Sequence, residues 1–352
     1  MHSRATRSYA AFDAKTPLRP FAFERRTPRP HDVQIAIDFC GVCHSDLHQV
    51  RDDWSRSKYP MVPGHEIVGH VVGVGASVTL HRLGDTVGVG CFVDSCRVCE
   101  MCKAGKEQFC VSGMTGTYNA IERDRVTPTY GGYSSQIVVD EQYVLRVPRG
   151  IAKDRAAPLL CAGITTYSPL RHWNVSKGQR IGILGLGGLG HLGVKLAVAM
   201  GAEVTLLSSS PSKREDARRL GAHEFVLATD DTALSACTSR FDLILDSVSA
   251  PHDLARFTRL LRPEGTLVLL GVPNEPYVVP AFALIMGRRS IAGSLIGGIL
   301  ETQEMLDFCG AHGVAADVET IPIQEIDQAY ERMLKADVRY RFVIDASSLG
   351  KD

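Results

Sequence analysis

Short apolar or alternating runs, separated by glycine and proline, fill the chain from residue 1 to about residue 150. Examples are VQIAIDF (33–39), IVGHVVGVG (67–75) and QIVVD (136–140). Runs of this length predict β-strands joined by turns, because successive side chains of a strand face opposite sides. A helix is first indicated around residues 43–50. This part of the chain is therefore predicted to be rich in strands and loops.

From about residue 155 the pattern changes to strands that alternate with helices. The segment RIGILGLGGLGHLGVKLAVAMG (180–201) predicts a strand, a glycine-rich turn and a helix. Five further segments predict, in turn, strand, helix, strand, helix and strand: EVTLLSSS (203–210), PSKREDARRLGA (211–222), FDLILDSV (241–248), DLARFTRLLRPEG (253–265) and TLVLLGV (266–272). Such alternation predicts an α/β fold class with a doubly wound parallel sheet. The last segment, 321–345, predicts a strand-like piece, an amphipathic helix and a closing strand.

Length and composition narrow the possible classes of protein. The chain has 352 residues, which favours two domains, and 45% of them are hydrophobic, enough for two cores. Lys+Arg and Asp+Glu number 39 each, so the formal net charge is zero, which argues against a nucleic-acid or membrane-surface partner. No apolar run approaches the roughly 20 residues that a membrane span needs. The N-terminal segment lacks the apolar core of a secretory signal, so the ten cysteines indicate a reducing compartment, and we expect the cytoplasm.

Four cysteines follow one another with the spacing C-x2-C-x2-C-x7-C: Cys96, Cys99, Cys102 and Cys110. In a chain without a secretory signal, this spacing favours a closed metal site over disulfides. Zinc suits the site best, because it accepts four sulfurs tetrahedrally and undergoes no redox chemistry. Four protein ligands leave no position for a substrate, so the reaction must be sought elsewhere.

A glycine-rich loop, GLGGLG (185–190), separates a predicted strand from a predicted helix. Glycines allow a tight turn and let backbone N–H groups approach a pyrophosphate at the positive end of the helix. The motif alone is also compatible with an ordinary tight turn, but its strand, its helix and the later alternation indicate dinucleotide binding. The residues predicted to contact the cofactor are Gly185, Gly187, Gly188, Leu189 and Gly190.

The end of the following strand indicates which dinucleotide is bound. An acidic residue there would bind the ribose 2′-hydroxyl of NAD. This chain instead has Ser208, Ser209 and Ser210, followed by Lys213 and Arg214. Hydroxyl groups and cations suit the negatively charged 2′-phosphate, so NADP is favoured over NAD. The two cations are also compatible with the solvated first turn of an ordinary helix.

Three further candidate ligands lie far apart in the sequence. Cys43, His65 and Cys161 occur in the segments CGVCHSDLH, PGHE and LLCAGITTY. Two thiolates and an imidazole are suitable zinc ligands, and three protein ligands leave a position open for substrate. Spacing alone does not show that these three residues bind a metal, because a single cysteine such as Cys161 is more often a small buried residue.

Five motifs resemble those of the zinc-dependent medium-chain alcohol dehydrogenases. They are GVCHSDLH (41–48), PGHEIVG (63–69), CRVCEMCKAGKEQFC (96–110), CAGITTYSPL (161–170) and GLGGLGHLGVKLA (185–197). The segment GSLIGG (293–298) and the serines after the second strand most resemble the cinnamyl-alcohol dehydrogenase branch and its bacterial aldehyde-reductase relatives. The resemblance runs in order over nearly the whole chain, apart from the first ten or so residues.

The resemblance implies a division into domains and two zinc ions per chain. Residues 1–155 would form a GroES-like, β-rich catalytic domain with both zinc sites, 156–294 a Rossmann domain that binds NADP, and 295–352 a return to the catalytic domain. A catalytic zinc would be held by Cys43, His65 and Cys161, with Glu66 as an alternative ligand. A structural zinc would be held by the four clustered cysteines.

The resemblance also implies roles around the catalytic zinc. Asp46 would orient His65 or another ligand, although capping the start of a helix is an alternative role. Ser45 would hydrogen-bond the reacting oxygen, and His48 would form the outer end of a proton relay rather than being an ordinary surface histidine. The residues implied to lie near the nicotinamide are Thr165, Ser294 and Ile296.

The implied activity is a zinc-dependent alcohol dehydrogenase that, with NADPH, runs mainly as an aldehyde reductase. Trp54 and Tyr118 would line a pocket for aromatic, cinnamyl-type or medium-to-long-chain substrates, although both residues are compatible with core packing. Family members form homodimers, so the segment around 285–299 is expected to supply an edge strand for a dimer.

Three other functions are compatible with parts of this pattern. An NAD-dependent alcohol dehydrogenase of the same fold would differ in cofactor kinetics. A reductase of the quinone-oxidoreductase type has no catalytic zinc, and its members lack the ligand trio. A zinc content of about one per chain instead of two would favour it. A non-catalytic NADP-sensing protein would transfer no hydride, but the presence of all three ligands with Ser45 and His48 argues against it.

Overall fold

The computed structural model describes residues 5–273 and 275–350. The chain forms two compact units, Met1–Cys161 with Gly297–Asp352, and Ala162–Ile296. The first unit therefore extends to Cys161. The resemblance, in contrast, implies a boundary at residue 155. The chain re-enters this unit at Gly297, close to the predicted residue 295.

The first unit is built on a seven-stranded sheet with the order β16-β17-β3-β4-β5-β9, in which β8 also pairs with β3. Its strands are β3 (Asp32–Gly41), β4 (Ile67–Val74), β5 (Thr86–Val89), β8 (Gln136–Asp140), β9 (Leu145–Arg146), β16 (Val318–Pro322) and β17 (Arg341–Asp345). Two further strand pairs are β1 (Thr6–Ala10) with β2 (Arg19–Phe23) and β6 (Phe92–Asp94) with β7 (Thr115–Gly116). The predicted richness in strands holds for this part of the chain.

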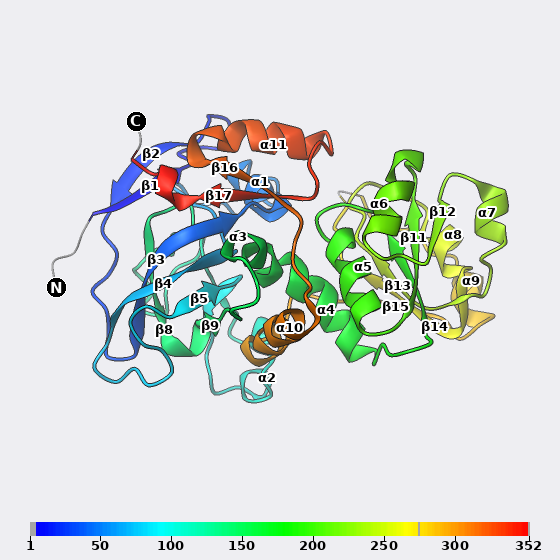
Figure 1. Cartoon of the computed structure of the whole chain (residues 1–352), viewed down its shortest axis with the longest axis horizontal. Helices are drawn as coiled ribbons and strands as arrows, with labels where there is room; N and C mark the ends of the chain where they lie inside the picture. Colours follow the sequence, from blue (N-terminus) through cyan, green and yellow to red (C-terminus); the bar gives the residue numbers. More distant parts are fainter. Residues whose placement is uncertain (1–4, 274, 351–352) are drawn as a thin grey trace. The chain divides into compact units, whose positions relative to one another are not determined.

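Helices of the first unit are short apart from those near the C-terminus. They are α1 (His44–Val50), α2 (Glu100–Lys103), α3 (Lys153–Ala156), α10 (Ile299–His312) and α11 (Ile326–Leu334). Single 3₁₀ turns are η1 (Glu107–Phe109), η2 (Glu141–Tyr143), η3 (Ala157–Leu160), η5 (Ile323–Glu325) and η6 (Ala346–Ser348). Figure 1 shows the C-terminal strand β17 beside the N-terminal strand β3, and Val343 of β17 pairs with Gly41 of β3. The C-terminal segment therefore completes the sheet that carries α1.

The second unit is a six-stranded sheet with the order β12-β11-β10-β13-β14-β15, and every pair in it is parallel. Its strands are β10 (Arg180–Leu184), β11 (Glu203–Ser208), β12 (Glu224–Leu227), β13 (Phe241–Asp246), β14 (Leu261–Leu269) and β15 (Ser290–Gly293). Its helical segments are α4 (Ala162–His172), α5 (Gly190–Ala199), η4 (Pro211–Lys213), α6 (Arg214–Arg219), α7 (Asp231–Ser235), α8 (Leu254–Thr258) and α9 (Ala281–Ile285). Figure 1 shows α5 and α6 on one side of this sheet and α7 to α9 on the other.

The order of strands places a topological switch point in the second unit. Strand β10 lies between β11 and β13, so the chain leaves β10 toward one edge of the sheet and later returns to its other side. Ligands of open α/β sheets bind outside the carboxyl ends of the strands at such a point. The glycine-rich loop begins at Gly185, directly after β10, and therefore lies there.

Two helices differ from the sequence-based prediction. The helix predicted over 253–265 ends at Thr258, and β14 already begins at Leu261. Pro263 disfavours helical backbone at the residue before it, and Glu264 adopts a positive φ of 67°. Helix α10 was not predicted at all, although its Met305, Leu306 and Cys309 are buried.

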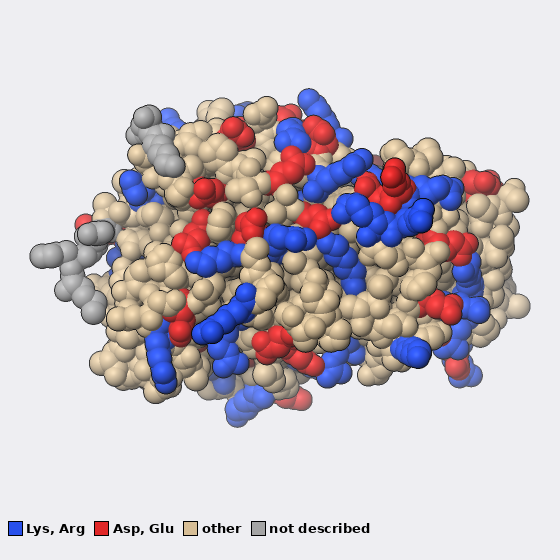
Figure 2. Space-filling view, viewed as in Figure 1, with Lys and Arg blue, Asp and Glu red and all other residues tan. Residues whose placement is uncertain are grey.

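The surface charges and the helices agree with the expectations drawn from net charge and apolar runs. Figure 2 shows Lys and Arg side chains interspersed with Asp and Glu over the face that it presents. Among the residues that the structure describes, no helix has both the length and the apolar character needed to cross a bilayer.

Candidate active site

The carboxylate of Asp46 lies at the centre of the candidate active site. Asp46 is in the first turn of α1 and is fully buried. Its Oδ2 accepts from the backbone N of Cys43 at 2.9 Å and from the hydroxyl of Tyr133 at 3.3 Å. Its Oδ1 accepts from the backbone N of Gly64 at 3.2 Å and lies 3.1 Å from Nδ1 of His65. Asp46 therefore bonds both the start of α1 and the ring of His65, so its contacts are compatible with both predicted roles.

Four potential metal ligands form one group, and two of them, Cys43 and His65, contact this carboxylate. One ligand atom each from Cys43, His65, Glu66 and Cys161 lies within 4.8 Å of all the others, and the two sulfurs are 4.0 Å apart. Cys43 precedes α1, His65 and Glu66 precede β4, and Cys161 follows η3. The fold thus brings together the three residues that lie far apart in the sequence. Because Nδ1 of His65 faces Asp46, its Nε2 is the nitrogen left for a metal.

Electrostatics within this group favour a bound cation. A hydrogen bond from the thiol of Cys161 lowers the pKa of Cys43 well below its usual range, and the same contact raises the pKa of Cys161. Burial alone would lower the pKa of His65, but the carboxylate of Asp46 raises it well above the usual value. A buried thiolate beside further anionic groups is costly unless a cation compensates it.

Glu66 adds an oxygen to the group and is tied to the C-terminal strand. It forms a buried ion pair with Arg341 of β17. Burial raises the pKa of Glu66 to about 7, and the positive charge of Arg341 opposes this rise. Its other oxygen, Oε2, is buried without a hydrogen-bond partner among the described residues. Two sulfurs, an imidazole nitrogen and an orphaned carboxylate oxygen are donors that fit a zinc ion.

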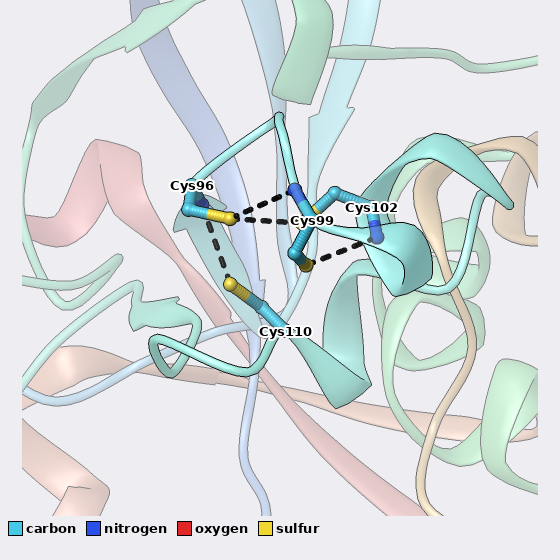
Figure 3. Close-up of side chains that lie close together, drawn as sticks. All are labelled: Cys96, Cys99, Cys102 and Cys110. Carbon is cyan, nitrogen blue, oxygen red and sulfur yellow. Dashed lines mark hydrogen bonds between the residues drawn. The ribbon is translucent and has the colours of Figure 1, made fainter.

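The four clustered cysteines form a second and separate group. One atom each of Cys96, Cys99, Cys102 and Cys110 lies within 4.8 Å of the others, and Figure 3 shows their side chains close together around α2. Backbone N–H groups of the loop donate to the sulfurs, for example from Cys99 to Cys96 and from Cys96 to Cys110, both at 3.4 Å. Such bonds from Val98 and Cys99 lower the pKa of Cys96 to about 6. All ten cysteines are free thiols, so the chemistry of this group also fits zinc.

The glycine-rich loop has the geometry of a dinucleotide-binding turn. Gly185 has a φ of 90°, and a side chain there would approach Val248 to 2.8 Å. A side chain at Gly190 would collide with the carbonyl oxygen of Gly185, whereas Gly187 faces open space. Leu189 precedes α5, whose first residue is Gly190, so the loop runs into the positive end of that helix, with Gly188 in the turn.

The serines predicted to select NADP lie at the carboxyl end of β11. Ser208 is buried and its hydroxyl accepts from the backbone N of Ser210 at 3.3 Å, while Ser209 is exposed. The guanidinium of Arg214 lies 4.6 Å from the centre of the Phe225 ring, and Lys213 is half-buried at the end of η4. No acidic residue ends this strand.

The predicted relay residues lie on one side of α1. Ser45 and His48 are three positions apart, which makes them neighbours on a helix. The hydroxyl of Ser45 is 3.7 Å from the sulfur of Cys43, and Nδ1 of His48 is 2.8 Å from Oδ2 of Asp53. Sequence analysis missed Asp53, because a carboxylate in an ordinary loop gives no signal of its own.

The two predicted pocket residues occupy different environments. Tyr118 is buried, stacks on His65 with ring centres 5.7 Å apart, and accepts from the side chain of Gln49 at 3.0 Å. Trp54 is 44% exposed and lies beside His48, with ring centres 5.3 Å apart. Gln49 and Trp54 both line a pocket of about 540 Å³. Trp54 therefore lines this cavity itself, whereas Tyr118 is not among its lining residues and accepts a hydrogen bond from Gln49 of its wall.

The residues predicted to lie near the nicotinamide belong to the second unit. Thr165 is half-buried on α4. Ser294 follows β15, and its backbone N donates to the carbonyl of Leu269 at 3.4 Å. Ile296 is buried and adopts a positive φ of 33°, which is unusual for a β-branched residue.

Comparison with known proteins agrees with this geometry. Residues 29–149 match the family model described as alcohol dehydrogenase GroES-like domain, and residues 188–311 match that described as zinc-binding dehydrogenase. An NADP-dependent alcohol dehydrogenase C of Mycolicibacterium smegmatis is 57% identical over 343 residues, covering 97% of this chain and 98% of the relative. The chain belongs to the zinc-dependent medium-chain alcohol dehydrogenase family.

Other members of the zinc-dependent medium-chain alcohol dehydrogenase family are similar over nearly their whole length. The aldehyde reductase YahK of Escherichia coli is 55% identical over 345 residues, covering 97% of this chain and 99% of the relative. A cinnamyl alcohol dehydrogenase structure from Sorghum bicolor has a TM-score of 0.96 at 44% identity and covers 99% of both chains. The Helicobacter pylori enzyme complexed with NADP(H) has a TM-score of 0.92 at 40% identity, covering 98% and 99%. The predicted family and fold class are therefore confirmed.

Replacement of one clustered cysteine tests the closed site. We expect Cys99→Ser to remove one zinc per chain and to lower the thermal midpoint of unfolding, because the ion then loses one of four ligands. Metal analysis and thermal denaturation measure both effects. Cys309→Ser is the matched control, since Cys309 is a buried thiol outside both groups and its replacement should leave the zinc content unchanged. Equal zinc contents in the two variants would contradict the assignment.

Proposed function

We propose that the chain is a zinc-dependent NADP(H) alcohol dehydrogenase that acts mainly as an aldehyde reductase. The observation that carries this proposal is the convergence of Cys43, His65, Glu66 and Cys161 into one group. A zinc ion held by the two sulfurs and the imidazole would keep a fourth position, which Glu66 or a substrate oxygen could take. Its NADP-dependent and aldehyde-reducing relatives support the choice of cofactor and reaction.

Some residues of this group are proposed to bind the zinc ion, and Asp46 is proposed to orient one of these ligands. Cys43, His65 and Cys161 hold the catalytic zinc, and Glu66 supplies an alternative oxygen. A zinc ion bound here supplies a Lewis acid for a carbonyl oxygen, and NADPH supplies the hydride. Asp46 holds Nδ1 of His65, which would leave Nε2 to bind the metal.

Protons travel through residues of α1. Ser45 lies next to Cys43, where its hydroxyl can donate to a substrate oxygen. His48 is the next polar group on the same helix face and is partly exposed, so it can exchange protons with solvent. Asp53 accepts from Nδ1 of His48 and fixes the orientation of the ring.

Cofactor binding rests on the second unit. The backbone of the glycine-rich loop and the N-terminus of α5 bind the pyrophosphate. Ser208, Ser209, Ser210, Lys213 and Arg214 favour a 2′-phosphate, because they offer hydroxyls and cations where an NAD-specific enzyme has an acid. Thr165, Ser294 and Ile296 are assigned to the nicotinamide end of the cofactor.

Aromatic, cinnamyl-type or medium-to-long-chain aldehydes suit the pocket beside α1. Tyr118 packs on His65, and Trp54 lines the cavity that Gln49 connects to Tyr118. Large flat side chains favour aromatic and long apolar substrates over ethanol-sized ones.

Hydride transfer to an aldehyde panel tests this function. We expect NADPH to be oxidised with cinnamyl, long aliphatic and terpenoid aldehydes, with a higher kcat/KM than with NADH. Cys43→Ser should abolish this turnover and remove one zinc per chain, yet leave NADPH binding intact, because the glycine-rich loop belongs to the other unit.

Cys40→Ser is the control, because Cys40 is a buried thiol three residues away that belongs to neither metal group. No hydride transfer to any aldehyde, despite two bound zinc ions, would favour a non-catalytic NADP-sensing protein. A kcat/KM with NADH that equals or exceeds that with NADPH would favour the NAD-dependent alternative.

The relay is tested by His48→Gln. We expect kcat to fall roughly tenfold and its pH profile to change, because the ring that passes protons to solvent is lost. His31→Gln is the control, since His31 also pairs with a carboxylate, Glu141 at 2.9 Å, but lies outside the relay. A pH profile of kcat that is identical in His48→Gln and wild type would rule the relay out.

A homodimer joined by the second unit, working in the cytoplasm, completes the proposal. Strand β15 is the edge of the parallel sheet, and near it α9 and its flanks expose Val278, Phe282, Ile285 and Met286. A free edge beside exposed apolar side chains is a typical association surface. Sedimentation equilibrium should give twice the mass of one chain, and the mass of a single chain would contradict it.

A further inference from the structure

Two buried tyrosines extend the hydrogen bonds of Asp46 to the C-terminal helix. The hydroxyl of Tyr330 on α11 donates to that of Tyr133 at 3.3 Å, and Tyr133 donates to Oδ2 of Asp46 at 3.3 Å. The exposed fractions of Tyr330, Tyr133 and Asp46 are 3%, 0% and 0%. Bulk solvent therefore does not reach either hydroxyl, and each finds its hydrogen-bond partner in the interior of the protein.

We propose that Tyr133 and Tyr330 are positioning residues that fix the carboxylate of Asp46, and through it His65, and so determine how firmly the catalytic zinc is held. This inference rests on the proposed function, because it takes the group around Cys43 to be the catalytic zinc site.

The hydrogen bonds of Asp46 explain why Tyr133 matters. Each carboxylate oxygen has two acceptor positions. Those of Oδ1 face Gly64 and His65, and those of Oδ2 face the backbone N of Cys43 and the hydroxyl of Tyr133. Without Tyr133, Oδ2 loses one of its two hydrogen bonds and the carboxylate is held less firmly. His65, which depends on Oδ1 for its orientation, then loses its fixed direction.

Tyr330 fixes the direction of the Tyr133 hydroxyl. A tyrosine hydroxyl has a single proton, so when Tyr133 donates to Asp46 it can only accept in its second hydrogen bond, and the other partner must be the donor. Tyr330 is that donor. Burial raises the pKa of both tyrosines well above the usual value, so both remain neutral donors. The C-terminal helix α11 is thereby connected to His65 through three side chains.

Replacement by phenylalanine separates this role from packing, because it removes only the oxygen. We expect Tyr133→Phe to accelerate the loss of the catalytic zinc to a chelator by about 10- to 100-fold, as for other groups that orient metal ligands. Tyr330→Phe should accelerate it by about 3- to 10-fold, because it acts through Tyr133. The double variant should be no faster than Tyr133→Phe, since the two residues form one chain of hydrogen bonds.

The readout is the rate of zinc release, supported by the visible spectrum of the cobalt-substituted enzyme, which reports the geometry around His65. Tyr143→Phe is the matched control: Tyr143 is also buried, but its hydroxyl bonds Ser95 at 2.8 Å, next to the four-cysteine group. It should leave release of the catalytic zinc unchanged. The phase of release that Cys43→Ser abolishes identifies the catalytic ion.

Release rates within about twofold of wild type in both single variants would overturn the inference while leaving the proposed function intact. Fully additive effects in the double variant would also overturn it. If Tyr133→Phe does not fold, Tyr330→Phe alone decides. If instead Cys43→Ser contains as much zinc as the wild type, the proposed function itself is overturned.

Discussion

The first unit is organised around one buried carboxylate. Asp46 accepts from two backbone N–H groups, a tyrosine hydroxyl and the imidazole of His65. Hydrogen bonds to a charged group contribute about 1.5–3 kcal/mol each, and a buried carboxylate without them would be very costly. The same contacts start helix α1, hold the loop before β4 and set the ring of His65. Local folding and the metal site are therefore two consequences of a single constraint.

The C-terminal segment that returns to the first unit contacts residues of the candidate metal site. Strand β17 brings Arg341 to Glu66, and α11 brings Tyr330 to Tyr133. Removing one partner of a buried ion pair costs about 3–5 kcal/mol, so Glu66 depends on a residue 275 positions away. The C-terminal segment thus supplies a countercharge to the candidate ligand Glu66 and a hydrogen-bond donor to Tyr133, which in turn donates to Asp46.

Features that depend on local spacing could be predicted from the sequence. The four cysteines and the glycine-rich loop lie within short segments, so their geometry follows from the residues next to them. Cys43, His65 and Cys161 could be named as candidate ligands from their residue types, but only the resemblance to a family implied that they share one site, because spacing does not show which distant residues meet. Asp53, Tyr133, Tyr330 and Arg341 could not be predicted, since their partners are set by the tertiary fold. The roles of all these residues in catalysis stay predictions until they are tested.

Crystallographic anomalous scattering at the zinc edge tests the account most directly. We expect one zinc peak among the four clustered cysteines and a second among Cys43, His65 and Cys161. The second zinc should lie about 2.0–2.1 Å from Nε2 of His65 and about 2.3 Å from the sulfurs of Cys43 and Cys161. Nδ1 of His65 should remain on Asp46. A second zinc bound through Nδ1, or a single peak confined to the four cysteines, would contradict the central claim that Asp46 orients His65 toward a catalytic metal.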